Sequence, residues 1–201
     1  IQLYGESMQE LFMFEEEMNI PVYIFEKDDV VVNKEKNITK DGLHLVFGIH
    51  MTHALQLILR DIVIQKEPDT EIFENLGCTN NLEDIFDECI STGKNNWQVW
   101  GSRKPGFDAY KLTQKWDITI DNDTFECEPD SDMNISDKKI IKNLLPIVSA
   151  RNKNFQKAPT IKEKYKSIFE TKMTEKKKKK KKVIVKNSIS TLKNIKNIDK
   201  N

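Results

Sequence analysis

The chain has 201 residues, of which 38% are hydrophobic and 8% aromatic, and its 32 basic and 32 acidic side chains cancel. No apolar run approaches the ~20 residues of a membrane-spanning helix, and the acidic start lacks the basic end and apolar centre of a signal peptide. Three widely spaced cysteines offer neither a disulfide framework nor a metal knuckle. We therefore expect an intracellular protein without a membrane partner, built from one packed domain and an additional segment.

The neutral total hides two segments of opposite charge. Residues 1–137 carry 28 acidic and 11 basic side chains, a net charge of −17, whereas residues 138–201 carry 21 basic and 4 acidic ones, a net charge of +17. The seven consecutive lysines at 176–182 repel one another, so we expect residues 151–201 to form a disordered, basic, low-complexity tail. Most such tails are simply solvated, and a nuclear-import or nucleic-acid contact is the alternative.

Helical spacing and strand alternation organise the first half of the chain. They predict, in chain order, a helix over 5–18, a buried strand over 22–25, a polar loop over 33–41, a strand over 43–49 and a helix over 52–65. Strict alternation in the second strand places His44 and Val46 on one face. The side chain of His44 is therefore expected to project from one definite face of the sheet.

The second half contains shorter elements. In chain order we expect a short element over 82–90 capped by Asn80 or Asn81, a strand over 97–100, a Gly and Pro loop over 101–108, and a hairpin of 116–121 with 124–128. The sum is an α+β domain over 1–128, with a mixed sheet and flanking helices. An acidic linker follows over 129–150, and its pattern is compatible with a helix over 137–148.

Two single residues could carry chemistry. Gly42 precedes a strand that delivers His44, whose imidazole can bind a phosphate oxygen, although a lone His in a small domain is usually structural. Asp87 lies among apolar residues, and a buried carboxylate needs a positive partner, so it indicates a metal ligand or an ion pair. A helix that leaves Asp87 simply exposed is an equal alternative.

A third group lies in residues 96–106, which combine two tryptophans and two glycines with Ser102, Arg103 and Lys104. The glycines let the backbone approach a ligand, and the cations suit a nucleoside triphosphate or a nucleic-acid backbone. A polar hairpin with core tryptophans is the alternative. Other patterns fail, because the sequence has no zinc-site spacing, calcium loop, Walker loop or dinucleotide fingerprint.

Taken in order, these segments resemble the archaeo-eukaryotic primase superfamily, and most closely the primase domain in primase-helicases of nucleocytoplasmic large DNA viruses. The resemblance covers about residues 7 to 120. It rests on Ile24-Phe25-Glu26-Lys27, Lys40-Asp41-Gly42-Leu43-His44, Phe86-Asp87 and Asn96 to Lys104. It implies template-directed nucleotidyl transfer with Mg²⁺ or Mn²⁺, a single-stranded DNA template, nucleoside triphosphates, and a fused or partner helicase, in the cytoplasm or nucleus of a host.

The resemblance also implies a role for each candidate residue. His44 would be a catalytic residue that contacts the nucleotide phosphates, and Asp87 would be the third metal carboxylate. Ser102, Arg103 and Lys104 would bind the nucleotide. Distant residues serve one phosphate only if they converge, so we expect His44, Asp87 and Lys104 to line one cleft.

One part of the superfamily pattern is missing from the chain. The superfamily supplies its first two metal carboxylates as Asp-x-Asp or Asp-x-Glu at a strand end upstream of the His strand. The nearby candidates here, Glu26, Asp28 and Asp29, all follow the Phe-Glu-Lys strand. We therefore expect an N-terminally truncated primase domain without independent catalysis, and a non-catalytic nucleic-acid-binding module or a decayed gene product is the alternative.

Overall fold

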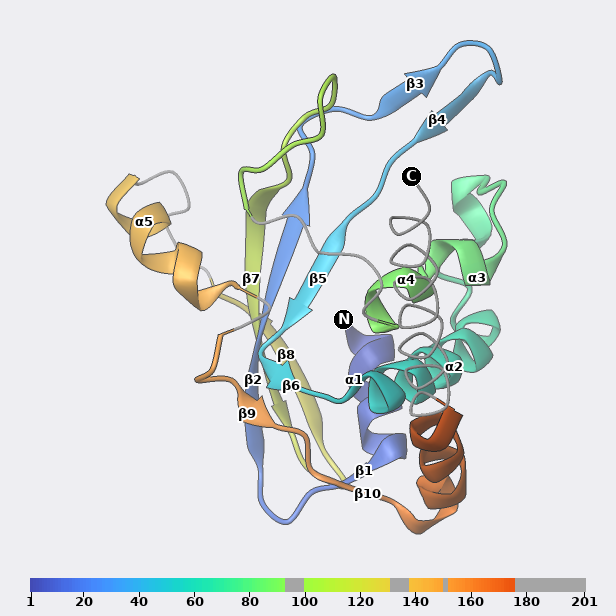
Figure 1. The fold of residues 1–201 in the computed structure, drawn as a ribbon, viewed down its shortest axis with the longest axis vertical. Coiled ribbons are helices and arrows are strands. Elements are labelled where there is room, and N and C mark those ends of the chain that lie inside the picture. Colours follow the sequence, from blue (N-terminus) through green and yellow to red (C-terminus); the bar gives the residue numbers. More distant parts are fainter. Residues whose placement is uncertain (93–99, 131–137, 150–151, 176–201) are drawn as a thin grey trace, which may run out of the picture. The chain divides into compact units, whose positions relative to one another are not determined.

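The computed structural model describes residues 1–92, 100–130, 138–149 and 152–175. The chain divides into two units, Ile1–Lys162 and Glu163–Asn201. The first unit is built on a four-stranded antiparallel sheet with the strand order β5-β2-β7-β8 (Figure 1). Its strands are β5 (His44–Phe47), β2 (Met18–Glu26), β7 (Lys111–Ile120) and β8 (Phe125–Pro129). Together with the helices described below, this sheet confirms the predicted α+β class.

Two long helices lie on one side of this sheet: the first contacts β7 and β8, and the second packs against the first. They are α1 (Gln2–Leu11) and α2 (His53–Thr70), and α2 begins where the Thr52 hydroxyl accepts a hydrogen bond from the Leu55 amide. The strand residues beneath them are fully buried: Ile20, Val22, Ile118 and Ile120. Helix α1 lies close to β8 because Gly5 has no side chain, since a Cβ there would lie 1.9 Å from the Phe125 ring. Burial of this apolar face is the main stabilising contribution to the fold.

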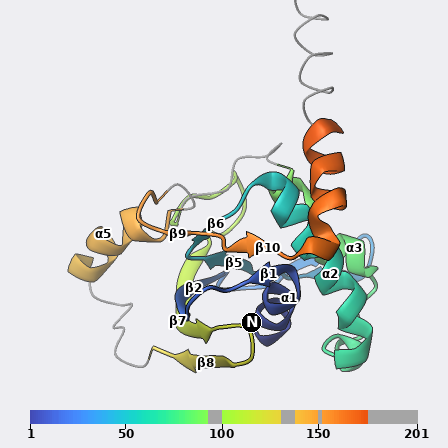
Figure 2. The ribbon, with the colours of Figure 1, turned by 90° about the horizontal axis from the view of Figure 1, so that it is seen from below.

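The opposite face of the sheet carries a second buried cluster. Tyr23, Phe25, Val46 and Leu112 pack there around Val148, which follows α5 (Lys138–Ile147). Four partly buried side chains pack against this group, which we call the Tyr23 cluster: Trp100, Tyr110, Leu144 and Phe155. In Figure 2, α5 lies on the side of the sheet away from α1 and α2. The sheet is therefore covered on both faces, and the helix predicted over 137–148 is confirmed.

Several short elements differ from the predictions. The segment predicted as a polar loop over 33–41 contains most of a hairpin, β3 (Val31–Asn33) with β4 (Ile38–Lys40), because three-residue strands leave too short a pattern to read. The element over 82–90 is two helical turns, α3 (Leu82–Ile85) and α4 (Glu88–Ser91). A 3₁₀ turn, η1 (Glu74–Leu76), precedes them.

The boundaries of two further predictions also shift. The first helix ends at Leu11 rather than near residue 18, because the chain turns there into β1 (Phe12–Met13). The predicted strand over 97–100 falls largely on residues 93–99, which lie outside the described residues, and Trp100 itself lies in a turn. The predicted hairpin of 116–121 with 124–128 is confirmed by the pairing of β7 with β8.

Residues 152–162 return to the first unit, although composition assigned them to the basic tail. There β9 (Gln156–Lys157) pairs in parallel with β6 (Ile49–His50), and β10 (Thr160–Ile161) pairs antiparallel with β1. The Lys162 amide donates to the Leu11 carbonyl at 2.9 Å. The structure thus differs from the boundary expected at residue 150, because backbone pairing with distant strands leaves no signature in composition. We call residues 152–162 the return segment.

The second unit begins with a helix over 163–175. The lysine run at 176–182 and the rest of the expected tail lie outside the described residues. Within the part of the chain that the structure describes, no helix combines the length and the apolar character needed to cross a bilayer.

Candidate functional site

His44 is the first residue of β5, and its imidazole stacks on the ring of Tyr110. The ring centroids are 3.8 Å apart and the planes differ by 19°. His44 pairs with Phe25 of the neighbouring strand β2, so both side chains project from the face of the sheet that carries the Tyr23 cluster. Burial, and then the charge of Lys27, lower the pKa of His44 below its ordinary value. The imidazole is therefore neutral at pH 7, with one N–H donor and one acceptor nitrogen.

Lys27 directly follows β2 and lies over the same aromatic group. Its ammonium is 5.1 Å from the centre of the Tyr110 ring and 5.4 Å from the centre of the Phe107 ring, which are cation–π distances. Burial, and then the charge of Asp41, raise the pKa of the Tyr110 hydroxyl, so it stays protonated at neutral pH. We call Lys27, His44, Phe107 and Tyr110 the aromatic cluster.

The loop that carries Ser102, Arg103 and Lys104 begins and ends beside this cluster. The Gly101 amide donates to the Tyr110 carbonyl at 3.1 Å and closes the base of the loop, while a turn joins the Phe107 amide to the Lys104 carbonyl at 3.1 Å. All three polar side chains are exposed. The structure therefore brings His44 and the 101–110 loop to the same end of the sheet, where Tyr110 joins them.

Asp87 is held in a different setting. It is the N-cap of α4, and its carboxylate accepts a hydrogen bond from the Cys89 amide at 2.8 Å. The neighbouring Phe86 ring packs on Tyr4 of α1, with centroids 6.2 Å apart, and Arg60 of α2 donates to the Phe86 carbonyl. Asp87 itself is exposed. The residue next to Asp87 is therefore held on the side of the sheet where α1 and α2 lie.

His44 and Asp87 consequently do not converge. Phe47 of β5 lies opposite Val22, and the centroid of its ring is 5.1 Å from that of Tyr4 in α1. Phe47 therefore points to the face of the sheet that the helices cover. His44 is three residues before Phe47, so strand alternation sends its side chain to the other face. The expected single cleft of His44, Asp87 and Lys104 is therefore not formed. Sequence order could not show this, because the side that α4 packs on depends on Phe86 and its tertiary contacts.

The carboxylates at the end of β2 and just after it are engaged by side chains of β7. Glu26 accepts a hydrogen bond from the Thr113 hydroxyl, and Asp28 forms an ion pair with Lys111. Within residues 1–92, 100–130, 138–149 and 152–175, no group of three or more His, Cys, Asp or Glu side chains is arranged to hold a metal ion. The described residues therefore do not fit the divalent centre that nucleotidyl transfer requires.

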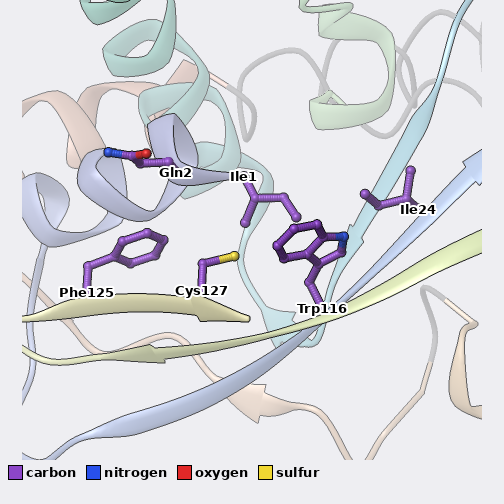
Figure 3. A pocket seen from close by; sticks show the side chains of 6 residues that line it. All are labelled: Ile1, Gln2, Ile24, Trp116, Phe125 and Cys127. Carbon is purple, nitrogen blue, oxygen red and sulfur yellow. The ribbon is translucent and has the colours of Figure 1, made fainter. Parts of the chain in front are cut away.

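A cavity of about 580 Å³ opens on the helix-covered side of the sheet (Figure 3). Its walls are mainly apolar: Ile1, Gln2, Ile24, Trp116, Phe125 and Cys127. Figure 3 shows Ile1 and Gln2 at the start of α1 facing Phe125, Cys127 and Trp116 of β8 and β7, with Ile24 of β2 farther to the right. Burial raises the pKa of the Cys127 thiol, so this thiol stays protonated at neutral pH. This cavity is not part of the His44 site.

The residues assigned to the site from the sequence do not include three members of the aromatic cluster: Lys27, Phe107 and Tyr110. Lys27 lies in the Phe-Glu-Lys segment, and its place directly after a buried strand was the available signal. Tyr110 directly precedes β7, but nothing in the sequence pairs it with a residue 66 positions earlier. Such a pairing follows only from the register of the strands.

The fold and the site together define an α+β domain with an antiparallel sheet and a cationic, aromatic cluster at one sheet end. Residues 1–116 match the family model of the C962R protein N-terminal AEP domain, and the chain belongs to this archaeo-eukaryotic primase-like family. The match confirms the resemblance and includes each candidate residue.

One relative is a protein of Acanthamoeba polyphaga mimivirus named as a helicase (L207/L206). It is 30% identical over 105 residues, which is 52% of this chain and 10% of that protein. The chain thus spans about a tenth of the length of this relative.

Proposed function

We propose that the chain is the primase-like domain of a viral primase-helicase, acting in DNA replication in a host cytoplasm or nucleus. Family membership over residues 1–116 supports the primase-like assignment, and the helicase-named mimivirus relative supports a fused or partner helicase. The observation that carries the proposal is the placement of His44 and Lys27 beside the exposed Arg103 and Lys104 loop. This end of the sheet is where a nucleoside triphosphate and a single-stranded template would bind.

The chemistry of the site is phosphate binding. A neutral His44 donates one N–H to a phosphate oxygen, and Arg103 and Lys104 neutralise phosphate charge on their exposed loop. The Ser102 hydroxyl adds a hydrogen bond. Aromatic rings beside cations also suit unpaired bases, which stack on such surfaces without sequence preference.

Divalent metal is not assigned to the described residues. Mg²⁺ or Mn²⁺ would require a set of carboxylates, and Asp87 lies on the other side of the sheet from His44. Because these residues do not fit a metal centre, the proposed role of the chain by itself is binding rather than transfer. The separation of His44 from Asp87 therefore also favours a second candidate, a nucleic-acid-binding module without catalysis.

Titration of a fluorescent nucleoside triphosphate into the full chain tests the binding site. We expect His44→Ala, and separately Arg103→Ala with Lys104→Ala, to weaken binding by about tenfold or more. This is the effect of losing one charge-assisted hydrogen bond to the phosphate. The control is Lys34→Ala with Lys36→Ala, which removes two exposed cations beside the β3–β4 turn. Equal affinity for all three variants and the parent would reject the site.

Primer synthesis separates the two candidates. The 201-residue chain is mixed with single-stranded template, nucleoside triphosphates and Mg²⁺ or Mn²⁺, and product length is measured on a gel. Binding without synthesis supports the module within this chain. Template-dependent synthesis that is lost on His44→Ala would show that the chain forms a complete primase site, contrary to the absence of a metal group among the described residues.

A further inference from the structure

The stack of His44 on Tyr110 joins an edge strand to a rigid part of the fold. β5 is an edge strand of the sheet, and His44 is its first residue. Tyr110, in contrast, packs against the buried Tyr23 cluster, and its carbonyl accepts a hydrogen bond from Gly101. The next residue, Lys111, begins β7 and pairs with Glu26 of β2. Tyr110 is therefore fixed from several directions, and its ring lies nearly parallel to the His44 imidazole.

Ring geometry limits what His44 can do without Tyr110. An imidazole has two nitrogens, and only the one that faces the ligand with the correct tautomer can bind a phosphate. The terminal rotation of a His side chain is broad and has no sharp minimum of its own. Near-parallel stacking at 3.8 Å allows only ring planes close to that of Tyr110. The stack thus selects one orientation from a range that a free side chain would sample.

The approach of the chain before β5 fits the same arrangement. A Cβ added at Gly42 would lie 3.6 Å from the Tyr110 hydroxyl, so this segment runs directly past the tyrosine. The Asp41 carboxylate accepts a hydrogen bond from the Gly42 amide at 2.7 Å and shapes the turn. Lys27, at 5.1 Å from the Tyr110 ring centre, is the cation that faces the stack from β2. These groups surround the Tyr110 ring on which His44 stacks.

We propose that Tyr110 is a positioning residue, whose ring holds the His44 imidazole in the orientation that binds a nucleotide phosphate. This inference rests on the proposed function, because it requires His44 to be a phosphate ligand. Preorganisation of this kind adds affinity, since the ordering of the side chain no longer opposes binding. The Tyr110 hydroxyl has no part in the effect, so a phenylalanine ring should replace it.

The experiment uses four variants of the full chain: His44→Ala, Tyr110→Phe, Tyr110→Leu, and the double variant His44→Ala with Tyr110→Leu. Affinity for the fluorescent nucleoside triphosphate is measured for each. We expect Tyr110→Phe to stay within about twofold of the parent, and Tyr110→Leu to lose about as much affinity as His44→Ala, roughly tenfold. The double variant should lose no more than His44→Ala alone, because the two residues act as a unit.

A second readout follows the His44 ring directly. The imidazole signals are titrated with pH by NMR, and His50 and His53 serve as internal controls for intact folding. We expect Tyr110→Leu to move the His44 titration toward that of a free histidine, because water replaces the stacked ring, while Tyr110→Phe leaves it unchanged. Unchanged chemical shifts of the His50 and His53 rings at one pH show that the fold is retained.

The outcomes separate the two proposals. If His44→Ala binds as tightly as the parent, the proposed phosphate site is wrong, and the positioning role fails with it. If His44→Ala weakens binding and Tyr110→Leu does not, the phosphate site stands and the positioning role is overturned. Additive losses in the double variant would likewise overturn it, because they would mean that Tyr110 acts independently of His44.

Discussion

Gly48 lies between β5 and β6, against the ring of Pro21 in β2, and a methyl group there has no room. A Cβ at Gly48 would lie 2.6 Å from Cγ and 2.7 Å from Cδ of Pro21, and 3.2 Å from its carbonyl oxygen. Carbon atoms in contact prefer about 3.5–4.0 Å, so one segment must move by roughly 1 Å. The proline ring cannot rotate away, and the Gly48 amide is tied to the same Pro21 carbonyl at 2.7 Å.

From this geometry we expect Gly48→Ala to lower the free energy of unfolding. Overpacking of this kind costs about 1–3 kcal/mol, and the loss of glycine freedom in the unfolded chain returns about 0.4–1 kcal/mol. The net destabilisation is therefore about 1–2 kcal/mol. Gly42→Ala is the matched control, because its nearest contact would be an ordinary 3.6 Å and its backbone is not left-handed. It should not lower stability, and the lost glycine freedom in the unfolded chain should raise it by up to about 1 kcal/mol.

Urea denaturation of the single variants and of the double variant with Pro21→Ala measures the effect. Removing the proline ring removes the two closest contacts, so Gly48→Ala should cost at least about 1 kcal/mol less in the Pro21→Ala background. The same cost in both backgrounds, or a Gly48→Ala variant as stable as the parent, would refute the reasoning. An altered slope of the denaturation curve would show that compactness has changed as well.

Three further measurements test the remaining features. Arg103→Ala with Lys104→Ala should reduce the slope of log affinity for single-stranded DNA against log salt concentration by about 1.4, or about 0.7 per lost phosphate contact, and an unchanged slope would remove the loop from the interface. Because the pKa of His44 is lowered on folding, the unfolded chain binds more protons, so this contribution to stability is present above pH ~6.5 and is lost as pH falls through the folded value. Between pH 7.5 and pH 5 the free energy of unfolding should therefore fall less for His44→Gln than for the parent. Equal decreases would contradict the burial of the ring. Phe155→Ala, in the return segment, should cost about 1–3 kcal/mol because its ring packs against the Tyr23 cluster, and no loss of stability would mean that the return segment is not docked.

The local patterns of the sequence determined a large part of the fold. Alternation along the strand after Gly42 correctly placed His44 and Val46 on one face, because successive side chains in any strand point to opposite sides. The β7–β8 hairpin and the helix α2 were predicted for similar reasons, since turn residues and helical spacing act over a few positions. The order of the motifs also carried the family resemblance, which the match over residues 1–116 confirms.

Only the tertiary structure decided which of the candidate residues meet. His44 meets Tyr110 because β5 and β7 both pair with β2, and the register of those pairs brings residues from distant segments to one sheet end. Asp87 is directed away because the half-buried Phe86 packs on Tyr4, and Arg60 of α2 donates to its carbonyl, on the other face of the sheet. The return segment was likewise hidden, because its pairing with β1 and β6 uses backbone groups that every residue possesses. Short-range patterns reflect the geometry of single elements, whereas the meeting of distant side chains depends on how those elements pack, and no local pattern encodes that.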